Sequence, residues 1–332
     1  MRRIWRYLAF ALIGLAAFVF LNNTSFLGPD LSGEPVLLAH RGIAQRFETA
    51  GLTNDSCTAE RMLPPTHAYL ENTIASMRAS FEAGADIVEL DVHPTTDGEF
   101  AVFHDWTLDC RTNGQGVTRE QSMVYLKTLD IGHGYTADGG KTFPFRGEAV
   151  GLMPTLEEVL ASFPDRSFLI NVKSNDPSEG KALAKFLAGL PPQRRTQLMV
   201  YGGDRPIAAL RDSLPEVKTL SRSSLKSCLL RYIGYGWTGA VPPACRSSVI
   251  FVPINIAPWL WGWPGRFLER MNSAGSHVFV IGPYEGGDFS TGIDNREDLS
   301  RLPEGYGGGV FTNEIEKIAP LLDVSIRGRS GQ

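Results

Sequence analysis

Two histidines, an arginine and several carboxylates lie at or just past the ends of apolar, strand-like runs in the first third of the chain. These segments read Ala39-His40-Arg41-Gly42, Glu71-Asn72-Thr73, Val88-Glu89-Leu90-Asp91-Val92 and Val102-Phe103-His104-Asp105. Imidazoles exchange protons near neutral pH, and carboxylates bind divalent cations. Together these residue types suit metal-assisted cleavage of a phosphate ester.

The strand alternation groups the charged residues of the third segment. Side chains of successive strand residues point to opposite faces, so Glu89, Asp91 and His93 share one face. Two carboxylates buried in an apolar strand without partners would cost several kcal/mol, roughly the desolvation penalty of each ion. This pattern suggests a bound cation. Whether His93 contacts the site is left open.

Beyond residue 34, short β-branched runs alternate with helix-like segments, which predicts a parallel sheet and an α/β fold of the (β/α)8 TIM-barrel type. Helices are predicted at residues 72–83, 155–161, 179–190, 205–213 and 265–274. Strands are predicted at residues 36–40, 87–92, 100–104, 168–173, 198–201, 217–220, 249–254, 278–281 and 309–312. This count exceeds eight by one, so either 217–220 or 249–254 is expected to lie outside the barrel.

The link between residues 92 and 100 is too short for a crossover helix. A hairpin at Asp97-Gly98 would send His104 to the opposite end of the sheet from Asp91. If His104 is catalytic, the link is instead an extended return, and the barrel lacks one outer helix. All the charged residues above then lie at the C-terminal ends of the strands, where TIM-barrel active sites are built.

Composition indicates one catalytic domain. With 332 residues and 43% hydrophobic content, the chain can bury one large core, and we expect a barrel domain over residues 34–332. The net charge of -4, without a basic block beyond the N-terminus, disfavours nucleic acid as a partner.

Residues 1–33 are predicted to form an N-terminal transmembrane or signal-anchor helix with a linker. Arginines precede an apolar run over residues 4–21, which only just spans a bilayer. A signal peptide is the alternative, but no convincing cleavage site follows. The positive-inside tendency predicts a membrane-anchored domain exported to the periplasm or cell exterior, and a secreted one if the segment is cleaved.

The four cysteines suit an oxidising compartment, since their spacing suggests neither zinc nor redox chemistry. Of the three possible connectivities, we favour Cys57 with Cys110 and Cys228 with Cys245. Free buried thiols are the alternative for a cytoplasmic domain.

The motifs quoted above, in their order and spacing, resemble the glycerophosphodiester phosphodiesterase family. The likeness continues through Arg111-Thr112-Asn113-Gly114, Met153-Pro154-Thr155 and Asn171-Val172-Lys173, and ends at Phe311-Thr312-Asn313. It implies a TIM-barrel hydrolase that uses a divalent ion, Ca²⁺ or Mg²⁺, to cleave glycerophosphodiesters into glycerol 3-phosphate and an alcohol.

The resemblance also implies a role for each matching residue. His40 and His104 match the family's acid-base pair, without indicating which is the acid. Arg41 and Lys173 match phosphate-binding positions, and Glu89 and Asp91 match the metal carboxylates. Glu71 matches an acidic residue that supports the metal or its waters; a charge that caps the helix starting near Asn72 is the alternative.

Three features depart from the family pattern. Asn171 stands where a third metal carboxylate is usual, which predicts weaker metal binding or a compensating role for Glu71. Residues 43–70 form a long insert, expected to cover or reshape the barrel entrance. Phe279-Val280-Ile281-Gly282 replaces a usual Trp-Thr pair and alters one wall of the pocket.

Two other functions remain open. A membrane anchor beside the barrel would bring its mouth near lipid headgroups, and Trp259, Trp261 and Trp263 could line a lipid site or simply pack a loop. That favours a lipid-directed, lysophospholipase D-like enzyme as the alternative. A non-catalytic phosphodiester receptor is the second, although a receptor needs no pair of histidines.

Overall fold

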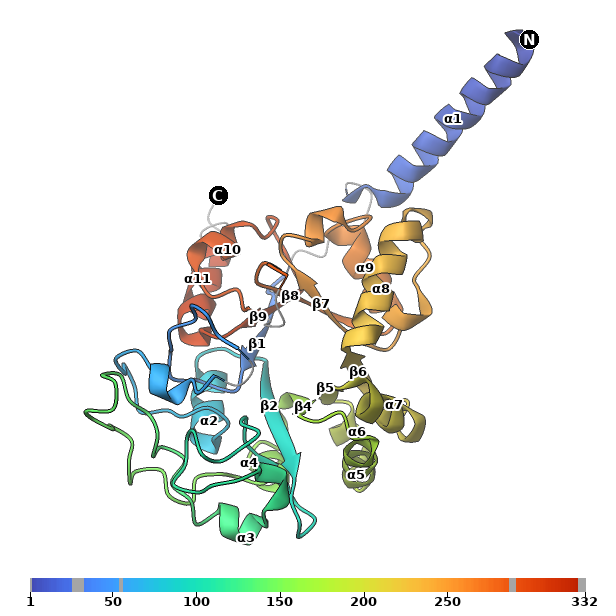
Figure 1. The fold of residues 1–332 in the computed structure, drawn as a ribbon. Helices are drawn as coiled ribbons and strands as arrows, with labels where there is room; N and C mark the ends of the chain where they lie inside the picture. The colour runs from blue at the N-terminus through green and yellow to red at the C-terminus, as the bar shows by residue number, and fades with distance from the viewer. Residues whose placement is uncertain (1, 26–32, 54–55, 287–290, 328–332) are drawn as a thin grey trace.

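A computed structural model of the chain describes residues 2–25, 33–53, 56–286 and 291–327. Its barrel strands are β1 (Val36–His40), β2 (Ile87–Pro94), β4 (Ser167–Val172), β5 (Leu198–Gly202), β6 (Lys218–Ser221), β7 (Val249–Pro253), β8 (His277–Ile281) and β9 (Gly309–Thr312). They are parallel and adjacent in the order β6-β5-β4-β2-β1-β9-β8-β7. Between β6 and β7, the Ser248 hydroxyl donates to the Thr219 carbonyl oxygen at 2.7 Å. The sheet is thus a nearly closed TIM barrel (Figure 1), as the sequence predicted.

The remaining strand, β3 (Phe100–Val102), lies outside the barrel wall. It pairs antiparallel with the end of β2, with Val102 opposite Val92 and Phe100 opposite Pro94. The link between them is therefore a hairpin, and the predicted extended return is wrong. The extra strand of our count is β3, whereas the segments 217–220 and 249–254 supply β6 and β7.

The hairpin keeps His104 near the carboxylate strand, contrary to our reasoning. β2 has eight residues: Val92 pairs with both β4 and β3, and His93 and Pro94 extend past the barrel wall to pair with β3 alone. The backbone N–H of Phe103 donates to the Asp91 carbonyl oxygen at 3.1 Å, which places His104 beside Asp91. The predicted gap in the outer layer is also filled, because α4 (Leu156–Ser162) lies between β3 and β4.

Helices follow the strands around the barrel. Several begin at a reciprocal capping box, as at Thr73 before α2 and Thr155 before α4. The 14-residue helix α8 was not among our predicted helices. The larger helices besides α4 are α2 (Ile74–Glu82), α5 (Pro177–Ala188), α7 (Asp204–Ser213), α8 (Arg222–Tyr235), α9 (Gly265–Ser273), α10 (Arg296–Ser300) and α11 (Ile315–Arg327).

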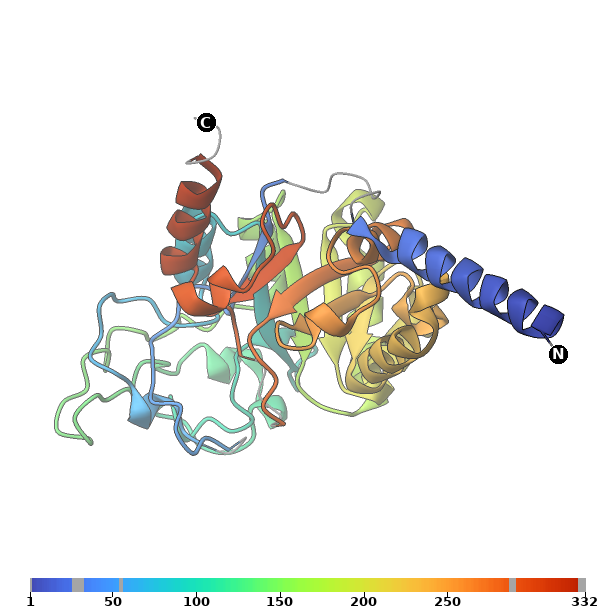
Figure 2. The same cartoon turned by 90° about the horizontal axis from the view of Figure 1, so that it is seen from above.

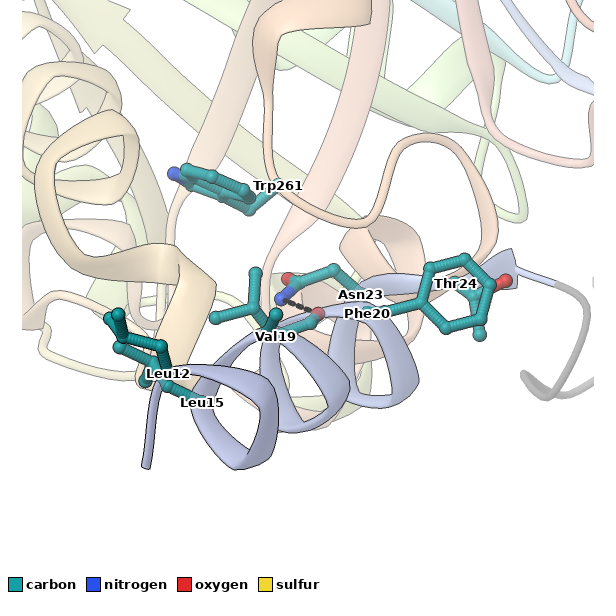
Figure 3. Close-up of a pocket in the computed structure, with 8 residues that line it drawn as sticks. Leu12, Leu15, Val19, Phe20, Asn23, Thr24 and Trp261 are labelled. Atoms are coloured by element: carbon teal, nitrogen blue, oxygen red, sulfur yellow. Dashed lines mark hydrogen bonds between the residues drawn. The ribbon is translucent and has the colours of Figure 1, made fainter. Parts of the chain in front are cut away.

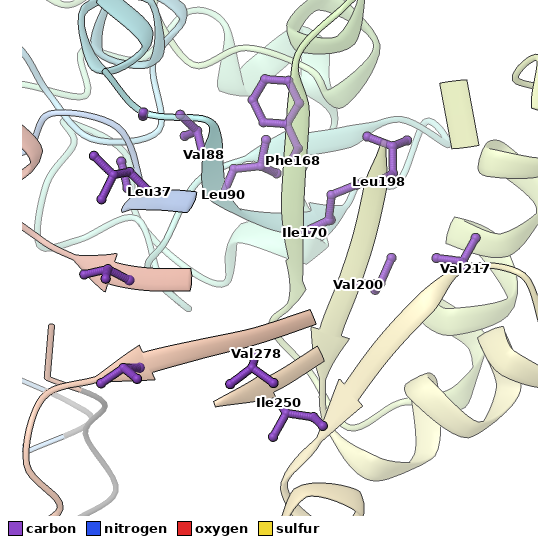
Figure 4. Packing of buried hydrophobic residues seen from close by; sticks show 14 of the residues in the cluster. Leu37, Val88, Leu90, Phe168, Ile170, Leu198, Val200, Val217, Ile250 and Val278 are labelled. Atoms are coloured by element: carbon purple, nitrogen blue, oxygen red, sulfur yellow. The ribbon is translucent and has the colours of Figure 1, made fainter. Parts of the chain in front are cut away.

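Apolar side chains fill both sides of the barrel wall. On β2, Val88 and Leu90 are fully buried in the layer between the strands and the outer helices (Figure 4). Ile87 belongs to a separate core inside the barrel. Glu89 and Asp91 share the alternation of Ile87, so they point inward nearer the C-terminal end of the strand.

Loops from two parts of the chain pack together beside β3. Residues 59–70 of the insert and residues 101–153 form one small core. The disulfide Cys57–Cys110 joins them, with its Cα atoms 5.5 Å apart. The second disulfide, Cys228–Cys245, joins α8 to the turn η5 (Pro243–Cys245), which precedes β7. Both disulfides agree with the prediction.

Helix α1 (Arg2–Asn23) projects away from the barrel (Figures 1 and 2). Its apolar side chains are exposed. Its span Arg3–Asn23 is long and apolar enough to cross a membrane. Near its base, Val19 and Phe20 line an apolar groove with Trp261 (Figure 3). The predicted linker at residues 26–32 lies outside the described residues.

The base of α1 is fixed at the N-terminal end of the barrel strands. Arg270 donates from Nη2 to the Asn22 carbonyl oxygen at 2.6 Å and from Nη1 to Asn23 Oδ1 at 3.0 Å. The cleft beside Asn22 is also lined by Arg246, which precedes β7, and by Ala274, which precedes β8. The rim formed by the C-terminal strand ends, here called the barrel mouth, is therefore at the other end of the barrel from the base of α1.

Candidate active site

The predicted site residues gather at the barrel mouth. His40 is the last residue of β1 and the register partner of Glu89 on β2. Asp91 lies opposite Asn171 on β4, and Lys173 directly follows that strand. The strand register alone thus brings one histidine, both strand carboxylates and one cation to the same rim.

A left-handed turn after β1 directs Arg41 toward the carboxylates. Arg41 and Gly42 have φ values of 59° and 81°. The Arg41 backbone N–H donates to the Glu89 carbonyl oxygen at 3.0 Å, and its guanidinium Nη1 lies 3.2 Å from Glu71 Oε1. Asn72 also has a left-handed φ of 59° and donates its N–H to the Arg41 carbonyl oxygen at 2.9 Å. Strained conformations for Arg41 and Asn72 are typical of functional sites.

Asp91 is buried and surrounded by donors. Arg41 Nε lies 3.1 Å from Oδ2, and Lys173 Nζ lies 3.4 Å from Oδ1. The side-chain amides of Asn171 and Asn72 donate to the two oxygens at 2.8 and 3.1 Å. Burial alone would raise the pKa of Asp91, but Lys173 and Arg41 hold it well below its usual range. Asp91 is therefore an ionised carboxylate.

Glu89 has the opposite electrostatic surroundings. The Tyr201 hydroxyl donates to its Oε1 at 2.6 Å, but Oε2 is buried without a hydrogen-bond partner. Burial and the neighbouring Asp91 raise the pKa of Glu89 to about 8. His40 Nε2 lies 3.7 Å from Oε2. The mouth thus holds one carboxylate oxygen that lacks a compensating donor.

The ring of His40 is oriented by Asn313, which follows β9. His40 Nδ1 lies 2.6 Å from Asn313 Oδ1, while the Asn313 amide donates to Asp294 Oδ2 at 2.7 Å. Because the amide oxygen accepts, the proton of a neutral His40 ring lies on Nδ1, and Nε2 is left unprotonated. Burial, followed by the charge of Arg41, lowers the pKa of His40 to about 3.

His104 is oriented by a carboxylate. Its Nδ1 lies 2.7 Å from Asp105 Oδ1, and the other oxygen of Asp105 accepts from Arg111 Nε at 2.8 Å. Burial lowers the pKa of His104, and the charge of Arg41 lowers it further. Although burial alone would raise it, Arg111 and His104 hold the pKa of Asp105 well below its usual range.

Sequence reasoning missed five residues that support the site. Asn72, Asp105, Arg111 and Asn313 belong to motifs that we quoted, but the pattern gave them no role. Tyr201 carries only a weak signal, its position at the end of a predicted strand.

The predicted metal ligands do not form a complete set of anionic donors. Among the described residues, no group of three or more His, Cys, Asp or Glu side chains is arranged to hold a metal ion. Glu71 pairs with Arg41 and also with Arg111, whose Nη1 lies 2.8 Å from Oε2. Burial alone would raise the pKa of Glu71, but these two arginines lower it. Asn171 is a neutral amide that donates to Asp91.

His93 is buried and lies close enough to Lys173, Asp91 and His104 to interact with them electrostatically. Its ring packs edge-on against Trp106, with centroids 5.9 Å apart. Phe279 and Ile281, from the altered pocket wall, are part of the core inside the barrel.

Comparison with known proteins identifies the family of the chain. Residues 40–186 match the Glycerophosphoryl diester phosphodiesterase family. A glycerophosphodiester phosphodiesterase from Caldanaerobacter subterraneus subsp. tengcongensis is 42% identical over 264 residues, which cover 76% of this chain and 92% of the relative.

Solved structures show the same fold. The glycerophosphoryl diester phosphodiesterase domain of a Mycobacterium tuberculosis protein has a TM-score of 0.60 at 16% identity, covering 87% of this chain and 99% of that one. An Oleispira antarctica phosphodiesterase, solved with its product sn-glycerol-3-phosphate, has a TM-score of 0.54 at 18% identity, covering 87% and 97%. From its motifs, its barrel and the identity to its bacterial relative, the chain belongs to the glycerophosphodiester phosphodiesterase family.

Proposed function

We propose that this phosphodiesterase hydrolyses glycerophosphodiesters to glycerol 3-phosphate and an alcohol, with His40 and His104 as its acid-base pair. The observation that carries the proposal is the matched support of the two rings. Each Nδ1 meets an oxygen, Asn313 Oδ1 at 2.6 Å or Asp105 Oδ1 at 2.7 Å. Nε2 of each ring is then the atom that exchanges a proton with substrate.

The residues that support the two rings differ in charge, and this difference is the basis for proposing separate roles for His40 and His104. The neutral amide of Asn313 favours an imidazolium less than a carboxylate does, so we take His40 as the base that accepts a proton from the attacking hydroxyl. The ionised Asp105 stabilises a protonated ring, so His104 is the acid that gives a proton to the leaving alkoxide. One proton is taken up and one released at each cleavage.

Arg41 and Lys173 would bind the phosphate. Both side chains are at the mouth, and both approach Asp91, at 3.1 and 3.4 Å. An anionic substrate could share these cations, since a guanidinium has five N–H donors and an ammonium has three. Fixed positive charge at this point stabilises the charge that builds on phosphate oxygens in the transition state.

We also propose that Ca²⁺ or Mg²⁺ acts with these residues. The unpartnered, buried Oε2 of Glu89 fits a cation, and Glu89 and Asp91 offer the hard oxygen donors that these ions prefer. Asn171 would contribute its amide oxygen if its side chain turned over. The bound ion would neutralise phosphate oxygens. A metal role for Glu71 stays a prediction, because both of its oxygens pair with arginines here.

The cellular location is proposed from α1 and the disulfides. An apolar N-terminal helix behind arginines fits a signal anchor, and two disulfides fit an exported domain. The domain would then work in the periplasm or outside the cell, and it would be secreted if the helix were cleaved.

The test is release of glycerol 3-phosphate from glycerophosphocholine by the full chain in detergent. The protein is treated with EDTA, then supplied with Ca²⁺ or Mg²⁺. We expect release that EDTA abolishes and either ion restores. Release that persists in EDTA would remove the metal from the proposal. No release under any condition from folded protein, with turnover of lysophosphatidylcholine instead, would favour the lipid-directed enzyme; binding without turnover would favour a receptor.

A further inference from the structure

Arg111 contacts the groups that support both halves of the site. Its side chain is buried, only 2% exposed. Nε lies 2.8 Å from Asp105 Oδ2, and Nη1 lies 2.8 Å from Glu71 Oε2. Asp105 in turn orients His104, and Glu71 pairs with Arg41. The Arg111 guanidinium therefore connects Asp105, which orients His104, to Glu71, which pairs with Arg41.

The Arg111 guanidinium also donates a hydrogen bond to a residue of the insert. Arg111 Nη2 donates to the Thr58 hydroxyl at 2.6 Å, and Nη1 donates to the Tyr135 hydroxyl at 2.5 Å. Cys57 and Cys110 immediately precede Thr58 and Arg111, and they form a disulfide. The cross-link therefore joins the two backbone segments at the points where they carry this hydrogen bond.

The backbone at Gly134 packs closely against the backbone at Cys110 and Arg111. Gly134 donates its N–H to the Arg111 carbonyl oxygen at 3.2 Å, and a Cβ added there would overlap the Cys110 carbonyl oxygen. The segment before Arg111 is thus fixed from one side by Gly134 and from the other by Cys57.

We propose that Arg111 is a positioning residue that fixes the side-chain orientations of both His104 and Arg41. In this proposal, residues 43–70 hold Arg111 in place through Thr58 and the Cys57–Cys110 disulfide. The insert is then part of the catalytic apparatus rather than only a cover at its entrance. The effect on rate rests on the proposed acid role of His104, because Arg111 reaches the reaction only through Asp105 and Glu71.

The first test is Arg111→Lys in the full chain. Lysine keeps the charge, but an ammonium cannot reproduce the planar fork that contacts Asp105, Glu71 and Thr58 at once. We expect kcat for glycerophosphocholine to fall at least about tenfold and KM to rise, as supporting residues of this kind do. Thr58→Val keeps the shape of the side chain and removes the hydrogen-bond acceptor. It should also lower kcat, but by a smaller factor than Arg111→Lys.

The second test separates positioning from stability with a matched pair of disulfides. Cys57→Ser/Cys110→Ser and Cys228→Ser/Cys245→Ser each remove one cross-link, so both should lower the melting temperature. Only the first should lower kcat, measured well below either melting temperature. Equal kcat in the two double variants would overturn the role of the disulfide, and Thr58→Val covers the case in which the first does not fold.

A readout that needs no turnover distinguishes this proposal from the proposed function. The ring resonances of His104 are identified in an NMR spectrum by their loss in His104→Gln. They should shift in Arg111→Lys and Thr58→Val and stay unchanged in Cys228→Ser/Cys245→Ser. Absence of glycerol 3-phosphate release by the wild type would count against the proposed function alone. Unshifted His104 resonances in Arg111→Lys would overturn the positioning role.

Discussion

At the residue scale, the two carboxylates on β2 differ in how their charge is balanced. Asp91 accepts from two amides and lies beside two cations, whereas Glu89 Oε2 has no hydrogen-bond partner. A cation bound at the mouth would therefore interact most favourably with Glu89. The neutral Asn171, opposite Asp91, contributes no charge to such an ion.

Asn171→Glu should tighten divalent metal binding, because it adds a carboxylate where only an amide now faces Asp91. We expect the Kd for Mg²⁺ or Ca²⁺ to fall at least about tenfold, equivalent to about 1.4 kcal/mol, in calorimetric titration. Gln193→Glu adds the same charge at an exposed position on α6 (Pro192–Arg195) and should leave the Kd unchanged. An unaltered Kd in Asn171→Glu would exclude residue 171 from the metal site.

His40 should make the stability of the metal-free protein pH-dependent. Burial, then Arg41, lowers the pKa of His40 from 6.5 to about 3. Between these values the unfolded chain binds a proton that the folded chain does not, so this group lowers stability as pH falls below 6.5. In EDTA, His40→Gln should lose about 2 kcal/mol less stability than the wild type between pH 7 and pH 5. Denaturant unfolding at the two pH values measures the difference, and equal losses would contradict the burial of a neutral ring.

At the element scale, strand alternation and motif spacing were enough to predict the barrel and the face that carries Glu89 and Asp91. Link length did not show how far β2 extends past the barrel wall, so the hairpin with β3 was misread. Helix α8 was missed because its serine-rich sequence has only a weak apolar stripe. Arg111 and Tyr201 were missed because their contacts join segments distant in sequence, which no local pattern reports.

The turn after β1 can be tested through Gly42. Its φ is +81°, and an added Cβ would meet the side chain and backbone of Ser76. Gly42→Ala should therefore shift Arg41 and raise KM for glycerophosphocholine more than it lowers kcat.

Gly51→Ala is the matched control, because Gly51 has a φ of +68° with open space around it. It should lower stability by about 1 kcal/mol, the usual cost of a left-handed residue, with KM unchanged. Equal KM values in the two variants would show that the turn does not position Arg41.

At the scale of the whole molecule, the base of α1 lies at the other end of the barrel from the mouth, and the helix runs outward from the barrel (Figures 1 and 2). The helix base contacts Arg270 near the end of α9, whereas the site lies at the C-terminal strand ends. The anchor that we expected beside the barrel is thus attached at the end of the barrel away from the mouth. This arrangement favours a substrate that arrives from water.

Reconstitution into nanodiscs should reveal this orientation. We expect KM and kcat for glycerophosphocholine to be the same in nanodiscs as in detergent, because the base of α1 lies at the other end of the barrel from the mouth. Lysophosphatidylcholine in the same disc should not be cleaved. Cleavage of that lipid in the disc, but not of the same lipid supplied in separate vesicles, would show that the mouth reaches the bilayer.

The most direct test of the account is the kcat for glycerol 3-phosphate release from glycerophosphocholine by His40→Ala and His104→Ala. Each change removes one member of the acid-base pair, so each should lower kcat by at least about 100-fold, the usual contribution of general acid-base catalysis. Thermal unfolding of each variant confirms that it is folded. Wild-type kcat in either folded variant would contradict the assignment of the two histidines.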